Sequence, residues 1–87
     1  MKIKSGFVVR EIAGQSVVIA LGDAGKIFNG LIKLNETGRM IWDMLSVGAE
    51  RDQIVAALVE AYDVDQAVLE QDCDSFLQAL QEKNILE

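Results

Sequence analysis

The chain has 87 residues, 51% of them apolar and 25% charged, which is the composition of one small globular domain over residues 1–87. It has no histidine and one cysteine, which excludes an imidazole base, a histidine zinc site, a Ser/His or Cys/His nucleophile pair and an internal disulfide. Residues 1–48 carry six Lys/Arg and four Asp/Glu (net +2), whereas residues 49–87 carry two Lys/Arg and ten Asp/Glu (net −8). The negative charge of this C-terminal half would repel the phosphates of a nucleic acid.

The hydropathy pattern and the cysteine content set the expected surroundings of the protein. Apolar runs such as Val17–Leu21 fall far short of the roughly 20 residues that cross a bilayer, and the first residues lack the basic-then-apolar layout of a signal peptide. The lone Cys73 fits a reducing compartment. We therefore expect a cytoplasmic protein with no membrane or nucleic-acid partner, no cofactor and no catalytic activity of its own.

The first half of the chain predicts a β-hairpin. Residues 7–12 and 16–21 are rich in β-branched and aromatic side chains, a composition that favours strands. Ala13-Gly14-Gln15 lies between them and has the spacing of a three-residue hairpin loop that contains glycine.

A loop and a short third strand are predicted next. Gly22, Gly25 and Asn29-Gly30 give residues 22–30 the composition of a loop, and Leu31–Leu34 is extended enough for a strand. Asn29-Gly30 is also suited to close a tight hairpin of its own, and the residues alone leave this alternative open.

The second half of the chain predicts three helices, over residues 36–46, 50–61 and 66–83. Asn35 is expected to cap the first helix and Gly48 to mark its end. Tyr62-Asp63-Val64 breaks the second helix, and Asp65 is expected to cap the third. Strands followed by helices indicate an α+β fold in which a small sheet packs on the helices.

Apolar side chains of the predicted helices are interpreted as core. Trp42, Met40 and Met44 have helical spacing within residues 36–46 and are expected to pack inside. Cys73 lies in the apolar stripe of the last helix with no base nearby to lower its pKa, which predicts a buried, inert thiol. The segment Ile85-Leu86 is expected to fold back and close the core.

The third predicted strand is the feature with the clearest functional potential. A three-stranded sheet has two edges, and Leu31–Leu34 carries one charge, Lys33, so its backbone N–H and C=O groups are candidates for pairing with a guest strand. Without further information, a covered interior strand is the favoured alternative. Lys33 is either a charge that prevents edge-to-edge aggregation or one that selects an acidic partner.

Five segments of the chain together resemble one known family. They are FVVREIAG at residues 7–14, FNG at 28–30, LNETG at 34–38 followed by Ile41-Trp42, YDVD at 62–65, and the stretch from Asp72 through Phe76 to Leu80. In this order and at this spacing they resemble the PqqD-like family over nearly the whole chain. The family is named for the pyrroloquinoline quinone biosynthesis protein D, and its domains are also called RiPP recognition elements.

The resemblance implies a winged helix-turn-helix-like fold, with a three-stranded antiparallel sheet followed by three helices. It also implies a non-catalytic peptide chaperone of natural-product biosynthesis. Such a protein binds the leader segment of a ribosomally made precursor peptide by strand addition and presents it to a modifying enzyme, often a radical S-adenosylmethionine protein.

The resemblance also implies where the leader peptide binds. The family's docking strand falls on Leu31, Ile32, Lys33 and Leu34. The helical wall of its groove falls on residues 69–77, from which the expected peptide-binding residues are Leu69, Asp72, Cys73, Phe76 and Leu77. Two copies that exchanged strands through the same edge would form a homodimer.

Two other functions are compatible with parts of the sequence. The helices would suit a winged-helix DNA-binding regulator, but the segment from Asp65 onward carries one Lys against five Asp/Glu before Glu87, so a recognition helix there would repel phosphate. Asp74-Ser75-Phe76 is similar to the Asp-Ser-Leu triplet at which carrier proteins are modified. In carriers that serine opens a helix, whereas Ser75 is expected in the middle of one.

Overall fold

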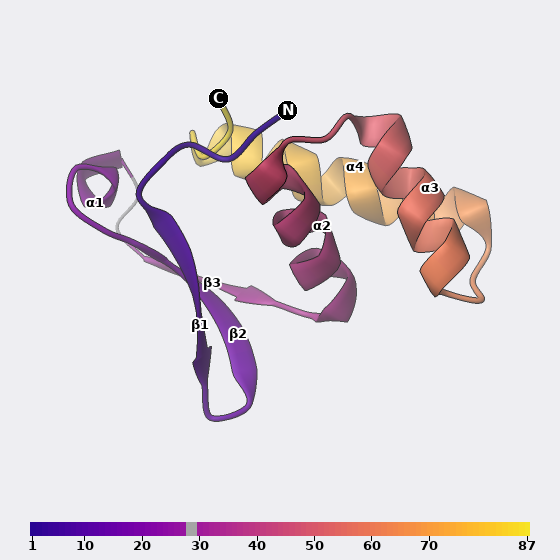
Figure 1. Cartoon of the computed structure of the whole chain (residues 1–87), viewed down its shortest axis with the longest axis horizontal. Helices are drawn as coiled ribbons and strands as arrows, with labels where there is room; N and C mark the ends of the chain where they lie inside the picture. The colour runs from indigo at the N-terminus through magenta and orange to yellow at the C-terminus, as the bar shows by residue number, and fades with distance from the viewer. Residues whose placement is uncertain (28–29) are drawn as a thin grey trace.

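The computed structural model describes residues 1–27 and 30–87. The three longer helices gather on one side of the molecule, and a β-hairpin projects away from them (Figure 1). Among the described residues, no helix combines the length and the apolar character needed to cross a bilayer. In chain order the elements are β1 (Phe7–Ile12), β2 (Gln15–Ala20), α1 (Ala24–Ile27), β3 (Leu31–Leu34), α2 (Glu36–Val47), α3 (Arg51–Ala61) and α4 (Gln66–Glu82).

β1 and β2 form an antiparallel hairpin whose turn is shorter than the sequence predicted. Ile12 pairs with Gln15, so the turn consists of Ala13 and Gly14 alone. Their φ values are 52° and 78°, the two positive values of a type I′ turn, whose twist matches that of the flanking strands. The prediction of a three-residue loop was wrong because Gln15, although polar, continues the strand pairing.

The sheet has the strand order β1-β2-β3 and is antiparallel throughout. In the described part of the chain β3 pairs with β2 only, from Ser16↔Leu34 to Ile19↔Leu31, and is therefore an edge strand. This pairing overturns the alternative of a covered interior strand. The alternative tight hairpin at Asn29-Gly30 involves a residue, Asn29, that lies outside the described residues.

The connection from β2 to β3 contains a short helix that the sequence did not predict. The α1 helix is a single turn, and the Ala24 N–H donates to the Leu21 carbonyl at 3.1 Å. Ala24 is buried against Gly6, where any Cβ would lie 2.8 Å from the Ala24 Cβ. The prediction of a loop over residues 22–30 missed this turn because four residues are too few to show helical periodicity.

The core lies between one face of the sheet and the three longer helices. Phe7, Val18 and Leu34 are the buried members of this inner sheet face, and Trp42 and Cys73 are buried as predicted. Removal of these apolar side chains from water is the main favourable contribution to folding. The other buried members include Ile41, Leu45, Ile54, Leu58, Leu69, Leu77, Leu80 and Ile85.

The ends of the helices follow the local sequence with one exception. The Asn35 Oδ1 caps α2 by accepting the Gly38 N–H at 2.8 Å, and Gly48 ends the same helix with a φ of 100°. Asp65 precedes α4 as predicted, but its carboxylate accepts no N–H of that helix. Its ψ of 133° differs from the −176° of the capping Asn35, so the backbone at Asp65 is not in the same capping conformation.

The two ends of the chain lie side by side (Figure 1). Ile3 forms a β-bridge with Leu86, and the Lys4 N–H donates to the Ile85 carbonyl at 2.8 Å. Ile85 and Leu86 are both buried, which confirms the prediction that this segment folds back onto the core. The C-terminal segment therefore anchors the residues that lead into β1.

Candidate functional site

Within the described part of the chain, the backbone of β3 presents unpaired groups at the edge of the sheet. The two-residue turn makes Ile12 and Gln15 a hydrogen-bonded pair. Hydrogen-bonded and non-bonded pairs alternate along an antiparallel ladder. The Leu21 N–H, which donates to the Gly6 carbonyl at 2.7 Å, fits this alternation. The odd-numbered residues of β2 therefore bond to β1, and the even-numbered ones bond to β3. It follows that Ile32 and Leu34 direct their N–H and C=O groups toward β2, whereas Leu31 and Lys33 direct theirs outward.

The side chains of β3 alternate between the two faces of the sheet. Leu34 is buried and Ile32 partly buried on the inner face, where they contact the core. Leu31 and Lys33 lie on the outer face, and Leu31 remains 64% exposed. An edge strand whose two faces differ in this way can both pair with a backbone and contact side chains on either side of the sheet.

The predicted residues of α4 divide into two groups. Leu69, Cys73 and Leu77 are buried in the core and support the helix from within. Asp72 is exposed and Phe76 is partly buried, so these two retain surface for a ligand. Asp72 and Phe76 are one helical turn apart and share a side of α4.

Phe76 lies close to the end of β3. A Cβ built at Gly38, in the first turn of α2, would lie 3.5 Å from the Phe76 Cε1 and 3.7 Å from the Leu34 Cδ2. Gly38 thus lets a side chain of α4 and one of β3 approach the same point of α2. This convergence places an aromatic side chain beside the docking strand that the sequence predicted.

An ion-pair network fixes α4 against α3. The Arg51 guanidinium donates to both carboxylate oxygens of Asp74 at 2.9 and 3.0 Å and to Glu70 at 3.2 Å. The hydrogen bonds to Asp74 raise the pKa of Arg51 above its usual range, and the same bonds lower the pKa of the Asp74 carboxyl below its usual value. The pair links the helix that carries Phe76 to the start of α3.

The surroundings of Cys73 and Ser75 on α4 disfavour a chemical role for either residue. Burial raises the pKa of the Cys73 thiol, and the neighbouring Asp74 charge raises it further. Ser75 lies in the interior of α4 and not at the start of a helix. The helix itself carries Glu70, Asp72, Asp74 and Glu82 and no Lys or Arg, which disfavours DNA recognition by α4.

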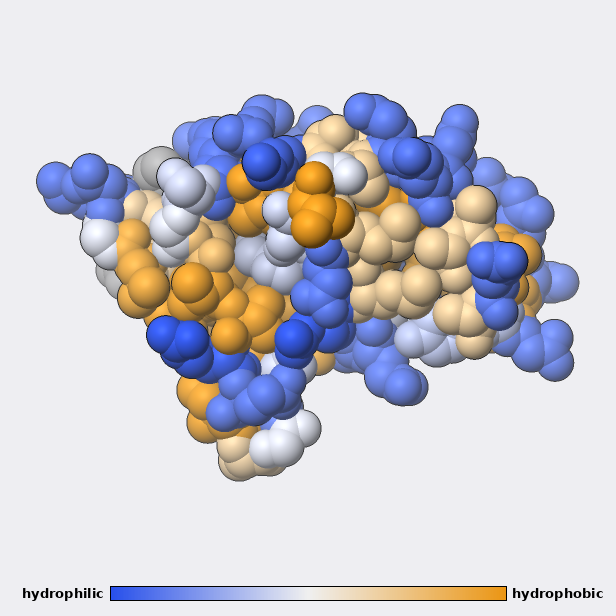
Figure 2. Space-filling model, viewed as in Figure 1, coloured by the Kyte–Doolittle hydropathy of each residue, from blue (hydrophilic) through white to orange (hydrophobic). Residues whose placement is uncertain are grey.

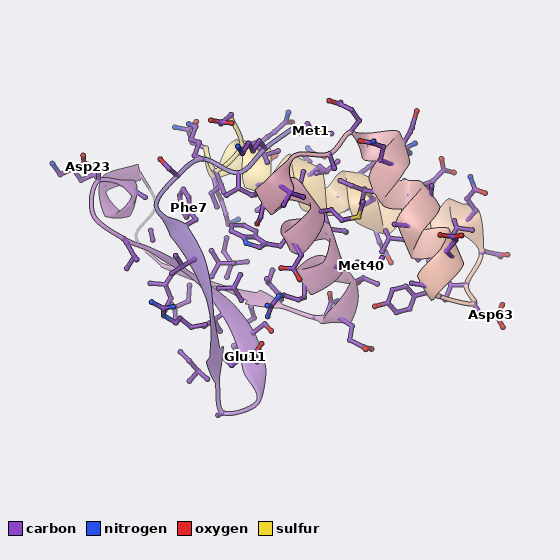
Figure 3. All side chains as sticks on the ribbon, viewed as in Figure 1. Met1, Phe7, Glu11, Asp23, Met40 and Asp63 are labelled. Atoms are coloured by element: carbon purple, nitrogen blue, oxygen red, sulfur yellow. The ribbon has the colours of Figure 1, made fainter. Side chains whose placement is uncertain are left out.

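A groove that the sequence did not predict runs between the hairpin and α2. Its apolar lining includes Met40, Met44 and Val47, which repeat along one side of α2, and Tyr62 at the end of α3. Glu11 and Met40 come from its two sides (Figure 3). The methionines pack only partly against the core, so their prediction as interior residues was incomplete. Met40, Met44 and the exposed Val47 are spaced four and three residues apart, and this spacing was the sequence pattern that could have predicted the surface stripe.

A salt bridge joins the two sides of this hairpin–helix groove, and a second one lies within α2. Arg39 on α2 donates to Glu11 on β1 at 2.8 Å and to Asp43 at 3.1 Å. Its pKa is raised, chiefly by the hydrogen bond to Asp43. The groove shares Lys33 and Leu34 with the predicted binding strand, but none of its lining residues comes from α4.

A three-stranded antiparallel sheet with an open edge strand, followed by three helices, defines a small winged-helix-like α+β domain. The chain belongs to the PqqD family, because the family model described as coenzyme PQQ synthesis protein D (PqqD) matches residues 8–86. A search of curated proteins found no match.

Two solved structures are similar over almost their whole length. The first is TbiB1 in complex with the TbiA(beta) leader peptide, with 32% sequence identity, a TM-score of 0.78, and coverage of 100% of this chain and 95% of that chain. The second is a lasso peptide synthetase B1 complexed with the leader peptide, with 18% identity, a TM-score of 0.74, and coverage of 97% and 93%. The second likeness is one of fold.

Proposed function

We propose that this protein binds the leader segment of a ribosomally made precursor peptide by strand addition to β3 and presents it to a modifying enzyme, without catalysing a reaction itself. The observation that carries the proposal is the outward direction of the Leu31 and Lys33 backbone groups at the edge of the sheet. Membership of the PqqD family and the leader peptide bound to the similar protein TbiB1 support the same conclusion.

The geometry suits a guest that contributes mainly its backbone. Hydrogen bonds to an edge strand give affinity with little demand on the guest sequence, and side-chain contacts on alternate positions give the choice of guest. Ile32 and Phe76, which are only partly buried, offer apolar surface on the inner side, and Asp72 lies one turn away from Phe76 on α4. Leu69, Cys73 and Leu77 contribute indirectly, since they hold this wall of the site in place.

The role of the protein is then to raise the local concentration of the precursor at an enzyme. A domain that contacts both partners converts their encounter into an effectively intramolecular step, without any chemistry of its own. The family resemblance supports a radical S-adenosylmethionine protein as that enzyme. Residues 49–87 carry a net charge of −8, which would attract a basic patch on the enzyme.

The test is a selection of random twelve-residue displayed peptides on the full chain, followed by binding measurements with two variants. Lys33→Pro removes an outward N–H while leaving the bonds between β2 and β3 intact, a position at which an edge strand tolerates proline. Lys33→Ala removes the same side chain but keeps the N–H, and is the matched control.

We expect Lys33→Pro to weaken selected peptides by about tenfold or more relative to Lys33→Ala, because a carbonyl of the guest loses its partner. Circular dichroism of both variants checks that the fold is retained. Equal affinities of the two variants for every selected peptide would contradict strand addition to β3. A dimer formed through the same edge would appear as competition between peptide binding and self-association in ultracentrifugation.

A further inference from the structure

Two rows of side chains on the outer face of the sheet run across all three strands. The register aligns Val8, Ile19 and Leu31 in one row, which is apolar. The pairings Arg10↔Val17 and Val17↔Lys33 form the next row. Both rows end at β3, so both stop at the open edge of the sheet.

The second row combines two cations with a buried aliphatic side chain. Val17 is only 5% exposed, although it points away from the inner face and is not part of the core cluster. This burial is expected where the aliphatic stems of Arg10 and Lys33, its neighbours on both sides, lie over it. Hydrophobic side chains gather over the sheet, with hydrophilic ones among them (Figure 2).

The charges on this face have one sign. Among the described residues, neither Arg10 nor Lys33 takes part in an ion pair, and the sheet's acidic residue Glu11 lies on the inner face, where it pairs with Arg39. The outer face therefore presents two cations and no carboxylate from β1, β2 or β3. A strand added beside β3 would place a side chain next to the end of each row.

We propose that the outer face of the sheet selects the guest strand through two alternate residues, an acidic one opposite Lys33 and an apolar one opposite Leu31. This inference rests on the strand addition proposed above. Leu31 and Lys33 are the residues that bond outward, so each lies directly opposite one guest residue on the same face. For an antiparallel guest, which continues the pairing of this sheet, the acidic residue comes first along the peptide, and the apolar residue follows two positions later.

The residue between these two falls on the opposite side of the guest strand. It lies across from Ile32 and faces the inner side, as does the residue before the acidic one, which lies across from Leu34 near Phe76. Apolar side chains suit both inner positions. The site therefore favours a short amphipathic segment whose single charge is negative and lies on the outer face.

The energetic effect of one such pair is modest but measurable. A cross-strand pair of opposite charges strengthens binding by up to about fivefold, and a like pair weakens it by a similar factor. Peptides that differ only by Asp or Lys at the acidic position should therefore differ in Kd by about three- to twentyfold on the unmodified protein.

The experiment uses the selected peptides and two variants of exposed residues, Lys33→Glu and Leu31→Lys. With the unmodified chain we expect Asp or Glu followed two positions later by an apolar residue. Lys33→Glu should exchange the acidic preference for Lys or Arg, and Leu31→Lys should replace the apolar preference by an acidic one. Kd values of matched peptide pairs on each variant measure the exchange.

The outcomes separate this inference from the proposed function. If peptides lose affinity with Lys33→Pro but keep the same charge preference with Lys33→Glu, strand addition stands and selection by the outer face is overturned. If no peptide depends on the Lys33 N–H, the proposed function fails and this inference fails with it. An acidic preference that Lys33→Glu reverses supports both.

Discussion

The junction between β3 and α2 depends on one side chain, Asn35. Its Oδ1 accepts the Gly38 N–H at 2.8 Å and the Thr37 hydroxyl at 3.1 Å. Gly38 is buried, so in Asn35→Ala its N–H would lose its partner at a position that water reaches poorly. Loss of a helix cap costs about 0.5–2 kcal/mol, and an unsatisfied buried donor about 1–3 kcal/mol, which together predict a loss of about 1–2 kcal/mol.

Thermal unfolding followed by circular dichroism measures this loss. For a domain of this size a change of about 1 kcal/mol shifts Tm by roughly 4–8 °C, so Asn35→Ala should lower Tm by about 5–15 °C. Asn35→Asp keeps an acceptor oxygen and adds a negative charge at the start of the helix, and should remain near the original Tm. Equal losses in the two variants, or none in Asn35→Ala, would refute the capping role of the amide oxygen.

Three further predictions concern the hairpin and α4. Ala13→Asn should stabilise the protein by about 0.5–1 kcal/mol in urea unfolding, because asparagine tolerates the positive φ of the turn better than alanine does; an unchanged midpoint would contradict the type I′ turn. The pair with Arg51 lowers the pKa of Asp74, so its stabilisation is present above the unfolded value near 4 and is lost as pH falls through the lower folded pKa. The Tm difference between the unmodified protein and Asp74→Asn should therefore vanish in strong acid and persist at neutral pH, and a difference independent of pH would argue against the ion pair. Cys73 should resist iodoacetamide at pH 8 in the folded protein and react on unfolding, since it is 0% exposed with a raised pKa; rapid labelling of the native chain would contradict its burial.

Much of the fold could be predicted because local signals and burial agree in this sequence. Asn35 and Gly48 mark the ends of a helix through their own hydrogen bonding and backbone conformation, and both lie where the sequence predicted. The predicted apolar stripe of Leu69, Cys73, Phe76 and Leu80 has helical spacing; three of the four are buried, and Phe76 is partly buried. Periodicity of this length identifies a helix and its inner side together.

The errors arose where one or two residues decide the conformation. Gln15 looks like a loop residue, yet its backbone completes the pair that fixes the two-residue turn and the alternation of bonds across the sheet. The turn Ala24–Ile27 depends on packing against Gly6, which is distant in sequence. Such contacts exist only after folding and leave no periodic pattern.

In the candidate site, too, local sequence patterns predicted some features, and others depend on the folded arrangement. The family resemblance assigned the expected docking strand to Leu31–Leu34, but the assignment of Leu31 and Lys33 to the outward bonds requires the register of both strand pairs. Membership of an apolar stripe could not separate the buried Cys73 from the partly exposed Phe76, because both repeat at helical spacing within that stripe. Met40 and Met44 were assigned to the core for the same reason, although a groove leaves them partly open.

Amide hydrogen exchange along β3, with and without a selected peptide, tests the central claim most directly. In the free protein the Ile32 and Leu34 amides should exchange slowly and the Leu31 and Lys33 amides rapidly, because only the first two bond to β2. Peptide binding should slow exchange at Leu31 and Lys33. Protection of those two amides in the free protein, or no change when a peptide binds, would contradict an open edge that a guest strand completes.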